Sequence, residues 1–267
     1  MKTAFIGSGN LAWHLSRALE AAHYPIADVY SRRPERARQL ANHLHGARVR
    51  TGLDFSDSPA RLFFLTVSDD AIPAVASALV VPPGSTVVHT SGSQSLAALR
   101  QGLRSEAVRA GVLYPLQTFS HHQAVDFSRV PLCLEGEDPA TEATLMTVAQ
   151  GLSHRVEVMD SARRRVLHLG AVMAGNFTNH LLVLAKRVLD EENLELDLLK
   201  PLLEETVRKA FEADDPAGVQ TGPAWRGDVG IIGKHLDHLA NRPNLQAVYR
   251  QLTESIRNTS SGTIGRL

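Results

Sequence analysis

The sequence predicts an α/β protein in which a doubly wound parallel sheet is followed by an all-helical region. Short apolar segments alternate with amphipathic segments over residues 1–160, as they do in parallel sheets covered by helices. From residue 161 onwards the apolar residues recur only at helical spacing. A glycine-rich turn, residues 7–12, joins the first strand to the first helix and indicates a Rossmann-type sheet. We therefore expect two domains, residues 1–160 and 161–267.

The glycine-rich turn reads Gly7-Ser8-Gly9-Asn10-Leu11-Ala12. Such a turn uses its first glycine for a sharp bend, its second for close approach of a pyrophosphate, and a small third residue for packing of helix on sheet. The free N–H groups and the dipole of the helix start favour the anion. We interpret residues 7–11 as dinucleotide-binding, and a plain strand-turn-helix connection is the alternative.

The remaining strands of the first region are short apolar runs, which suit buried parallel strands. Between them, apolar residues recur every three or four positions, as on one face of a helix. Pro34 can open one helix, because its fixed φ suits a first turn. The expected strands are residues 3–6, 26–30, 62–67, 86–89, 110–113, 130–134 and 156–158. Expected helices, after the one that begins in the glycine-rich turn, are residues 34–44, 70–79, 96–103 and 139–152.

The second region reads as a series of helices. Asp160 or Ser161 can cap a long helix that reaches about residue 189. Residues 194–211 suggest another, in which Pro201 either makes a kink or marks the true start. Asp228 can cap a third helix, and the last begins near residue 243.

The end of the second strand indicates which dinucleotide binds. NAD sites usually carry Asp or Glu there for the ribose 2′-hydroxyl, whereas this chain has Ser31, Arg32 and Arg33. A serine hydroxyl and two guanidinium groups suit a 2′-phosphate. Asp28 lies too early in the strand to be the ribose ligand. We expect NADP(H), and the alternative is that both arginines are simply solvated.

Two further strand ends carry candidate cofactor contacts, because ligands of open parallel sheets bind at the carboxyl ends of strands. Val67 and Ser68 follow one strand, and Ser91 and Gly92 follow the next. Small residues at these positions let the backbone lie beside a ribose and a nicotinamide. Asp69 we interpret as a helix-start residue.

A third strand end offers residues whose role the sequence leaves open. Tyr114 and Gln117 could face a substrate or could satisfy local backbone groups. We expect no metal site, because His121 and His122 are adjacent and no acidic residue stands at ligand spacing.

Composition limits the possible partners. Lys plus Arg and Asp plus Glu both number 28, so no global basic field attracts nucleic acid or an anionic membrane. No apolar run has the length of a membrane span, and the N-terminus enters a strand at once, unlike a secretory signal. Cys133 is the only cysteine, which excludes an internal disulfide and fits the reducing cytoplasm.

Several segments together resemble an uncharacterised family of NADP-dependent oxidoreductases: residues 5–12, 89–93, 114–120, 168–181 and 221–228. That family joins a Rossmann-like domain to a helical domain of the 6-phosphogluconate-dehydrogenase C-terminal type. The resemblance covers essentially the whole chain, and residues 221–228 are its most specific motif. More distantly, the layout is similar to pyrroline-5-carboxylate reductase and ketopantoate reductase. The resemblance implies an NADPH-binding reductase, dimeric through the helical domain, and implies no particular substrate.

Candidate catalytic residues lie on the long helix and in the specific motif. His168 and Asn176 occupy positions that share or flank one helical face. The wider hydroxyacid dehydrogenases use a lysine and an asparagine from the corresponding helix, and this chain has His168 in place of the lysine. That departure argues against simple hydroxyacid dehydrogenation, although a histidine can also donate a proton near neutral pH. The alternative is that both side chains are structural.

Arg226 is the candidate for binding a substrate carboxylate, since a guanidinium can hold a carboxylate through two hydrogen bonds. It could equally pair with Asp228 inside the helical domain.

Two functions of different classes follow from the sequence. In the first, NADPH gives hydride to a small carbonyl or imine acid, and the protein orients the substrate and supplies a proton. In the second, the protein is a non-catalytic NADP(H) sensor or partner-binding module. His168, Asn176 and Arg226 favour the enzyme.

Overall fold

The computed structural model describes residues 1–121 and 123–264. His122, which with His121 is expected not to bind a metal, lies outside the described residues. Contacts in the structure divide the chain into two units, Met1–Asn176 and Phe177–Leu267, which are described separately below. The domain boundary at residues 160 and 161 stays a prediction.

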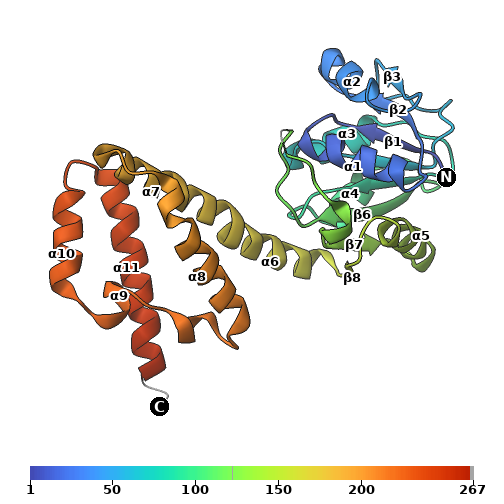
Figure 1. Cartoon of the computed structure of the whole chain (residues 1–267). Coiled ribbons are helices and arrows are strands. Elements are labelled where there is room, and N and C mark those ends of the chain that lie inside the picture. The colour runs from blue at the N-terminus through green and yellow to red at the C-terminus, as the bar shows by residue number, and fades with distance from the viewer. Residues whose placement is uncertain (122, 265–267) are drawn as a thin grey trace. The chain divides into compact units, whose positions relative to one another are not determined.

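The first unit is built on one sheet (Figure 1). Among the described residues this sheet has eight strands in the order β3-β2-β1-β4-β5-β6-β7-β8. Neighbouring strands run parallel except β6 and β7, which are antiparallel. The strands are β1 Thr3–Ile6, β2 Ile26–Tyr30, β3 Arg48–Arg50, β4 Leu62–Leu65, β5 Thr86–His89, β6 Arg109–Pro115, β7 Leu132–Gly136 and β8 Val156–Val158. The predicted α/β class, with a mainly parallel sheet and a helical C-terminal region, is confirmed.

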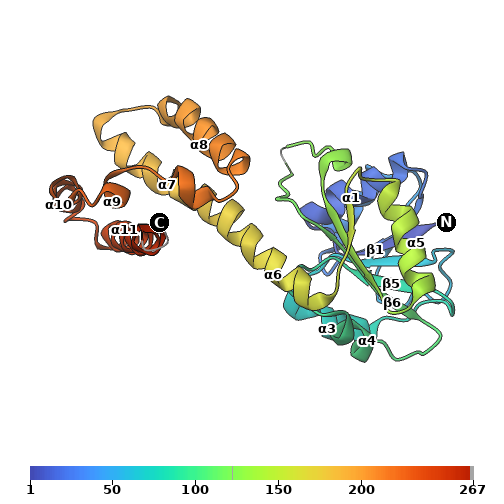
Figure 2. The same cartoon turned by 90° about the horizontal axis from the view of Figure 1, so that it is seen from below.

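Helices cover both faces of this sheet (Figure 2). Phe5 of β1 points into one core cluster with α1, α2 and α5, and its neighbour Ile6 points into a second with α3 and α4. This alternation is what a strand buried on both faces produces. The helices are α1 Asn10–Ala21, α2 Pro34–Ala41, α3 Ile72–Ala78, α4 Leu96–Gly102 and α5 Pro139–Gln150.

Two features of the sheet differ from the sequence-based expectation. Strand β3 was not predicted, because its three residues include no apolar run; Arg48 and Arg50 instead pair with the buried carboxylate of Asp28 on β2. Strand β7 is antiparallel to β6 because no covering helix stands between them. The described residues of that connection contain only a short 3-10 turn, Phe127–Arg129, and antiparallel neighbours need no crossover.

Beyond β8, every element within the described residues is helical. Asp160 caps α6 by accepting the Arg163 N–H at 2.8 Å, and Asp228 caps α10 by accepting the Ile231 N–H at 3.3 Å. Pro201 lies in the first turn of α8, so it marks the start of that helix. The elements are α6 Ser161–Ala171, a π-helical segment Val172–Phe177, α7 Thr178–Leu189, α8 Lys200–Glu212, α9 Pro223–Arg226, α10 Val229–His238 and α11 Pro243–Ile264.

A buried guanidinium ties the start of α6 to the sheet. Arg164 has none of its surface exposed; its Nη1 donates to Glu135 Oε2 on β7 at 2.6 Å. Its Nη2 donates to the Gln94 carbonyl, after β5, at 2.7 Å. The Ser161 hydroxyl adds a bond to the same Glu135 oxygen at 2.7 Å and accepts the Leu96 N–H at 3.0 Å. The first turns of α6 therefore have a set position relative to β5 and β7.

We expect Arg164→Ala to lower the free energy of unfolding by about 3–5 kcal/mol, because the Glu135 carboxylate then stays in place without its charge partner. The neighbouring Arg163 is exposed, so Arg163→Ala is the matched control and should change stability by less than about 0.5 kcal/mol. Urea unfolding followed by circular dichroism measures both. Equal losses in the two variants would contradict a stabilising role for the buried pair.

A buried histidine ends β5. His89 has no exposed surface, and its Nδ1 accepts the Ser91 N–H at 3.1 Å. Burial, with the positive charge of Arg164 as a second cause, lowers its pKa from 6.5 to about 4. His89 is therefore neutral in the folded protein at neutral pH.

The His89 shift predicts a stability loss in mild acid. Between pH 6.5 and about 4 the unfolded chain binds a proton at this histidine and the folded chain does not, so stability falls as the pH falls through that window. The full loss from this group is about 3 kcal/mol. Chemical unfolding at pH 7.5, 6 and 5 should show a shallower pH dependence for His89→Asn than for the wild type. Parallel curves would show that His89 does not contribute.

Candidate functional site

The predicted cofactor residues gather at one edge of the first unit. Strand β1 pairs with β2 on one side and with β4 on the other, so the sheet order reverses direction at β1. Open parallel sheets bind ligands outside the carboxyl ends of their strands at such a reversal. The segments after β2, β1, β4 and β5 lie side by side at this edge, and they carry all the predicted cofactor residues.

The glycine-rich turn has the geometry that an approaching anion requires. Gly7 has φ +118°, and a Cβ there would lie 2.3 Å from the Thr66 carbonyl oxygen, so only glycine fits. A Cβ on Gly9 would meet nothing within 4 Å, which leaves the start of α1 open. No side chain caps α1, and its first turn carries no acidic residue. Its first N–H groups are therefore free of a side-chain partner.

The other residues of the turn have structural contacts as well. Asn10 donates from Nδ2 to the Phe119 carbonyl at 2.8 Å, which ties the start of α1 to the loop after β6. Leu11 packs partly against the first core cluster. Ser8, Asn10 and Leu11 stay predicted cofactor residues, through backbone groups in the case of Asn10 and Leu11.

The end of β2 presents exposed positive charge. Arg32 and Arg33 are both exposed, and neither guanidinium has a hydrogen bond or ion pair within residues 1–121 and 123–264. Ser31 accepts the Arg33 N–H at 3.4 Å. Asp28, by contrast, is fully buried and occupied by Arg48, Arg50 and Ser58, so its carboxylate cannot serve a ribose.

The ends of β4 and β5 are joined by hydrogen bonds between side chains. Ser93 donates from Oγ to Asp69 Oδ2 at 2.5 Å, and Ser91 Oγ accepts the N–H groups of Ser93 and Gln94, each at 3.0 Å. The hydroxyl of Ser91 thus shapes its own turn. Asp69 begins the 3-10 turn Asp69–Ala71 that leads into α3, as expected of a helix-start residue, and its side chain binds Ser93 and caps no helix. Beside them, Val67 is half-buried and Ser68 exposed.

His168 lies directly over Gly92. A Cβ on Gly92 would come within 2.6 Å of His168 Nδ1 and 2.8 Å of Tyr114 Cζ, so neither ring leaves room for a side chain there. The Tyr114 hydroxyl and His168 Nδ1 are 3.0 Å apart, and the two rings meet edge to face. Burial raises the pKa of Tyr114 to about 12, so its hydroxyl stays protonated at neutral pH.

Asn176 follows His168 by eight positions and lies beyond the end of α6. It is exposed, shares no hydrogen bond with His168 in the described structure, and belongs to the π-helical segment Val172–Phe177. A π turn holds more residues than an α turn, so Asn176 lies at a different angle about the axis from the one expected.

Arg226 belongs to the second unit, where it ends the short helix α9 and is exposed. The alternative pairing with Asp228 does not occur among the described residues, because Asp228 caps α10.

Residues important to this site escaped sequence reasoning. The sequence offers Tyr114 either as a substrate contact or as a partner of local backbone groups, and it gives no sign of the buried pair of Arg164 and Glu135. Arg164 stands one helical turn before His168, and this spacing indicates that the two side chains lie on the same face of α6. Its partners lie 29 and 70 positions away, and no local pattern identifies them.

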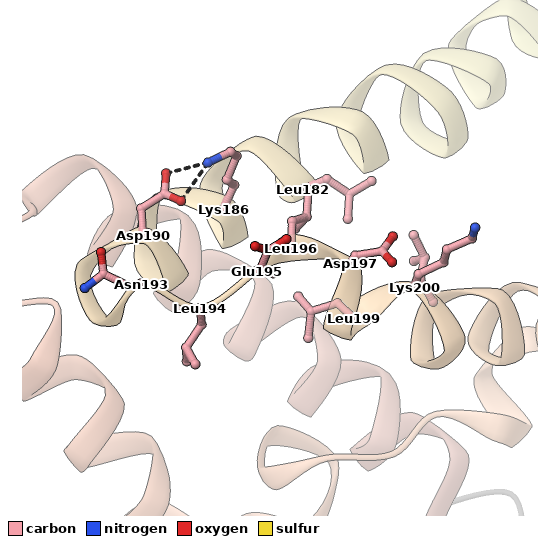
Figure 3. Close-up of a pocket in the computed structure, with 11 residues that line it drawn as sticks. Leu182, Lys186, Asp190, Asn193, Leu194, Glu195, Leu196, Asp197, Leu199 and Lys200 are labelled. Atoms are coloured by element: carbon pink, nitrogen blue, oxygen red, sulfur yellow. Dashed lines mark hydrogen bonds and ion pairs between the residues drawn. The ribbon is translucent and has the colours of Figure 1, made fainter.

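The second unit has a surface hollow of about 710 Å³ that contains none of the predicted site residues (Figure 3). Its walls come from α7, the following loop and the start of α8. Lys186 there is held by both oxygens of Asp190, at 2.6 and 2.8 Å. Leucines form much of the remaining wall: Leu182, Leu194, Leu196, Leu199 and Leu203.

The described residues contain no group of three or more His, Cys, Asp or Glu side chains that could hold a metal ion. In the same part of the chain, no helix combines the length and apolar character needed to span a bilayer.

Comparison with known proteins places this geometry in a family. Residues 130–256 match the family described as a domain of unknown function (DUF2520). The crystal structure of an inferred NADP oxidoreductase from Bacteroides fragilis is 38% identical, with a TM-score of 0.87, over 96% of this chain and 98% of that one. No curated protein matches the chain.

More distant solved structures share the fold. An imine reductase from Myxococcus stipitatus in complex with NADP⁺ is 16% identical, with a TM-score of 0.68, over 98% of this chain and 95% of that one. A 1-pyrroline-5-carboxylate reductase from Streptococcus pyogenes is 12% identical, with a TM-score of 0.64, over 97% and 98%. With the close similarity to the Bacteroides protein, the chain belongs to the family of NADP oxidoreductase-like proteins that carry the DUF2520 domain.

Proposed function

We propose that the protein is an NADPH-dependent oxidoreductase that transfers hydride to a small carbonyl or imine acid. The observation that carries the proposal is the position of His168, over Gly92 and at the same sheet edge as the glycine-rich turn. A proton-donating side chain and a dinucleotide turn on one edge are what a reductase requires.

The residues at this edge fit NADPH. The open start of α1 would take the pyrophosphate on the backbone of residues 7–11. Arg32 and Arg33, with Ser31, would take the 2′-phosphate, because both guanidinium groups are exposed and unengaged in the described structure. Residues 67–68 and 91–92 would lie beside the nicotinamide riboside. When bound, NADPH supplies the hydride.

Three side chains of the chain would handle the substrate. His168 donates a hydrogen bond or proton to the oxygen or nitrogen that is reduced, supported by Asn176. Arg226 holds the substrate carboxylate through its guanidinium, which no described residue engages. The helical region also serves as a homodimer interface in this proposal, because it exposes large apolar side chains, among them Leu198, Leu202 and Phe211. We place the protein in the cytoplasm, where the thiol of Cys133 stays reduced.

The cofactor assignment predicts that NADPH binds more tightly than NADH. Replacing both Arg32 and Arg33 with alanine should weaken NADPH by roughly 2–4 kcal/mol, from the loss of charge-assisted hydrogen bonds, and should leave NADH nearly unchanged. Calorimetric titration measures all four affinities. Arg104→Ala is the matched control, since Arg104 is exposed and lies between α4 and β6 at the other end of the strands. Equal affinities of the wild type for both cofactors would remove the 2′-phosphate site.

The catalytic assignment predicts separate effects of two substitutions on a small keto acid or cyclic imino acid. His168→Ala should lower kcat by about 10²–10⁴-fold with the NADPH affinity nearly intact. Arg226→Ala should act largely on KM, because a carboxylate clamp binds the ground state as well. His154→Ala, an exposed histidine of the first unit, is the control. If His168→Ala keeps the wild-type kcat, His168 is not the donor.

A further inference from the structure

The second ring over Gly92 also has a chemical role. We propose that Tyr114 is the proton source behind His168: its hydroxyl donates to Nδ1, holds the imidazole proton on Nε2, and replaces that proton when Nε2 gives it to the substrate. This inference rests on the proposed reductase function and adds a second residue to the site.

The contact between the rings is specific. The 3.0 Å distance between the Tyr114 hydroxyl and His168 Nδ1 is the only side-chain hydrogen bond that either residue makes in the described part of the chain. Gly92 permits the pair, since any larger residue would collide with both rings. Tyr114 comes from the end of β6 and His168 from α6, and the buried Arg164 anchors α6 one turn earlier.

The direction of this hydrogen bond follows from its surroundings. Tyr114 is a protonated hydroxyl at neutral pH, because burial raises its pKa to about 12. The hydroxyl bonds no other acceptor among the described residues, and in the proposed arrangement it donates its proton to Nδ1. A neutral imidazole that accepts at Nδ1 carries its own proton on Nε2.

The other titratable and charged groups around the pair are engaged or neutral. Arg164, on α6, is paired with Glu135 of β7, and Asp69, after β4, accepts from Ser93. Cys133 lies opposite Tyr114 in the register of β7, and burial raises the pKa of its thiol. His89, at the end of β5, is neutral. None of these groups competes with Tyr114 as the donor to Nδ1.

The relay balances in protons and electrons. As the substrate carbon accepts hydride from the nicotinamide, the Nε2–H bond breaks and its proton joins the substrate oxygen or nitrogen. The Tyr114 O–H bond breaks and an Nδ1–H bond forms, so the imidazole ends neutral in its other tautomer. The tyrosinate then takes a proton from water. Without the hydroxyl, loss of the Nε2 proton would leave an imidazole anion, and a neutral His168 could not complete the transfer.

The tautomer can be measured without turnover. Protein labelled with ¹⁵N-histidine is studied by NMR at pH 8, and the His168 ring is identified by its absence in His168→Gln. We expect a proton on Nε2 and a hydrogen-bonded, unprotonated Nδ1. Tyr114→Phe should shift the Nδ1 resonance, whereas Tyr24→Phe, a half-buried tyrosine whose hydroxyl makes no hydrogen bond among the described residues, should not. A proton on Nδ1 in the wild type, or an unchanged resonance in Tyr114→Phe, overturns the relay.

Kinetics with pyruvate, glyoxylate and 1-pyrroline-5-carboxylate as probe substrates supply a second test. At pH 8 Tyr114→Phe should lower kcat at least tenfold with the NADPH affinity unchanged, and should recover activity as the pH falls, because solvent then supplies the proton that the hydroxyl gives in the wild type. A wild-type pH profile in Tyr114→Phe overturns the relay. Failure to bind NADPH refutes the proposed function instead, and the NMR result still shows whether Tyr114 controls the tautomer.

Discussion

The buried guanidinium of Arg164 is the contact on which the candidate site depends. It joins β7, the segment after β5 and the first turn of α6, and the Ser161 hydroxyl closes the same network. A charge without exposed surface is costly unless its partners are held in place, so the network keeps these three segments together. His168 follows one turn later on the same helix. Its place over Gly92 therefore depends on an ion pair between residues that are not among the predicted cofactor or substrate contacts.

At two glycines the fold depends on the absence of a side chain. Gly7 turns the chain against the Thr66 carbonyl, and Gly92 makes room for two rings. Gly9 differs from both, because a side chain there would point into open space. Gly7 and Gly92 are therefore required by packing within the fold, whereas packing within the fold does not require a glycine at position 9. The predicted approach of a pyrophosphate to the backbone at Gly9 requires such open space.

The parts of this structure that follow from local patterns could be predicted, and those that depend on distant pairings could not. Alternating apolar runs and the glycine-rich turn suffice for the class of fold and for the edge of the sheet. Strand β3 is short and basic, so its own residues do not predict a strand. Its Arg48 pairs with the carboxylate of Asp28 on β2, some 20 residues earlier in the chain. The π-helical segment is a departure from helical regularity that spacing rules do not anticipate, and it changes the angle of Asn176 about the helix axis from the one that α-helical spacing gives. Tyr114 and His168 are 54 positions apart, and only the folded chain joins them.

A histidine at position 168, and not the lysine expected from the resemblance to hydroxyacid dehydrogenases, is consistent with these surroundings. Arg164 already places one positive charge at the start of α6, and that charge contributes to keeping His89 neutral nearby. A lysine would add a second cation to the same part of the helix, and Glu135 is already engaged with Arg164 and Ser161. An imidazole can act without a net charge when another group replaces its proton. The Tyr114 hydroxyl is placed to do so, which makes the histidine on α6 and the tyrosine at the end of β6 parts of one arrangement.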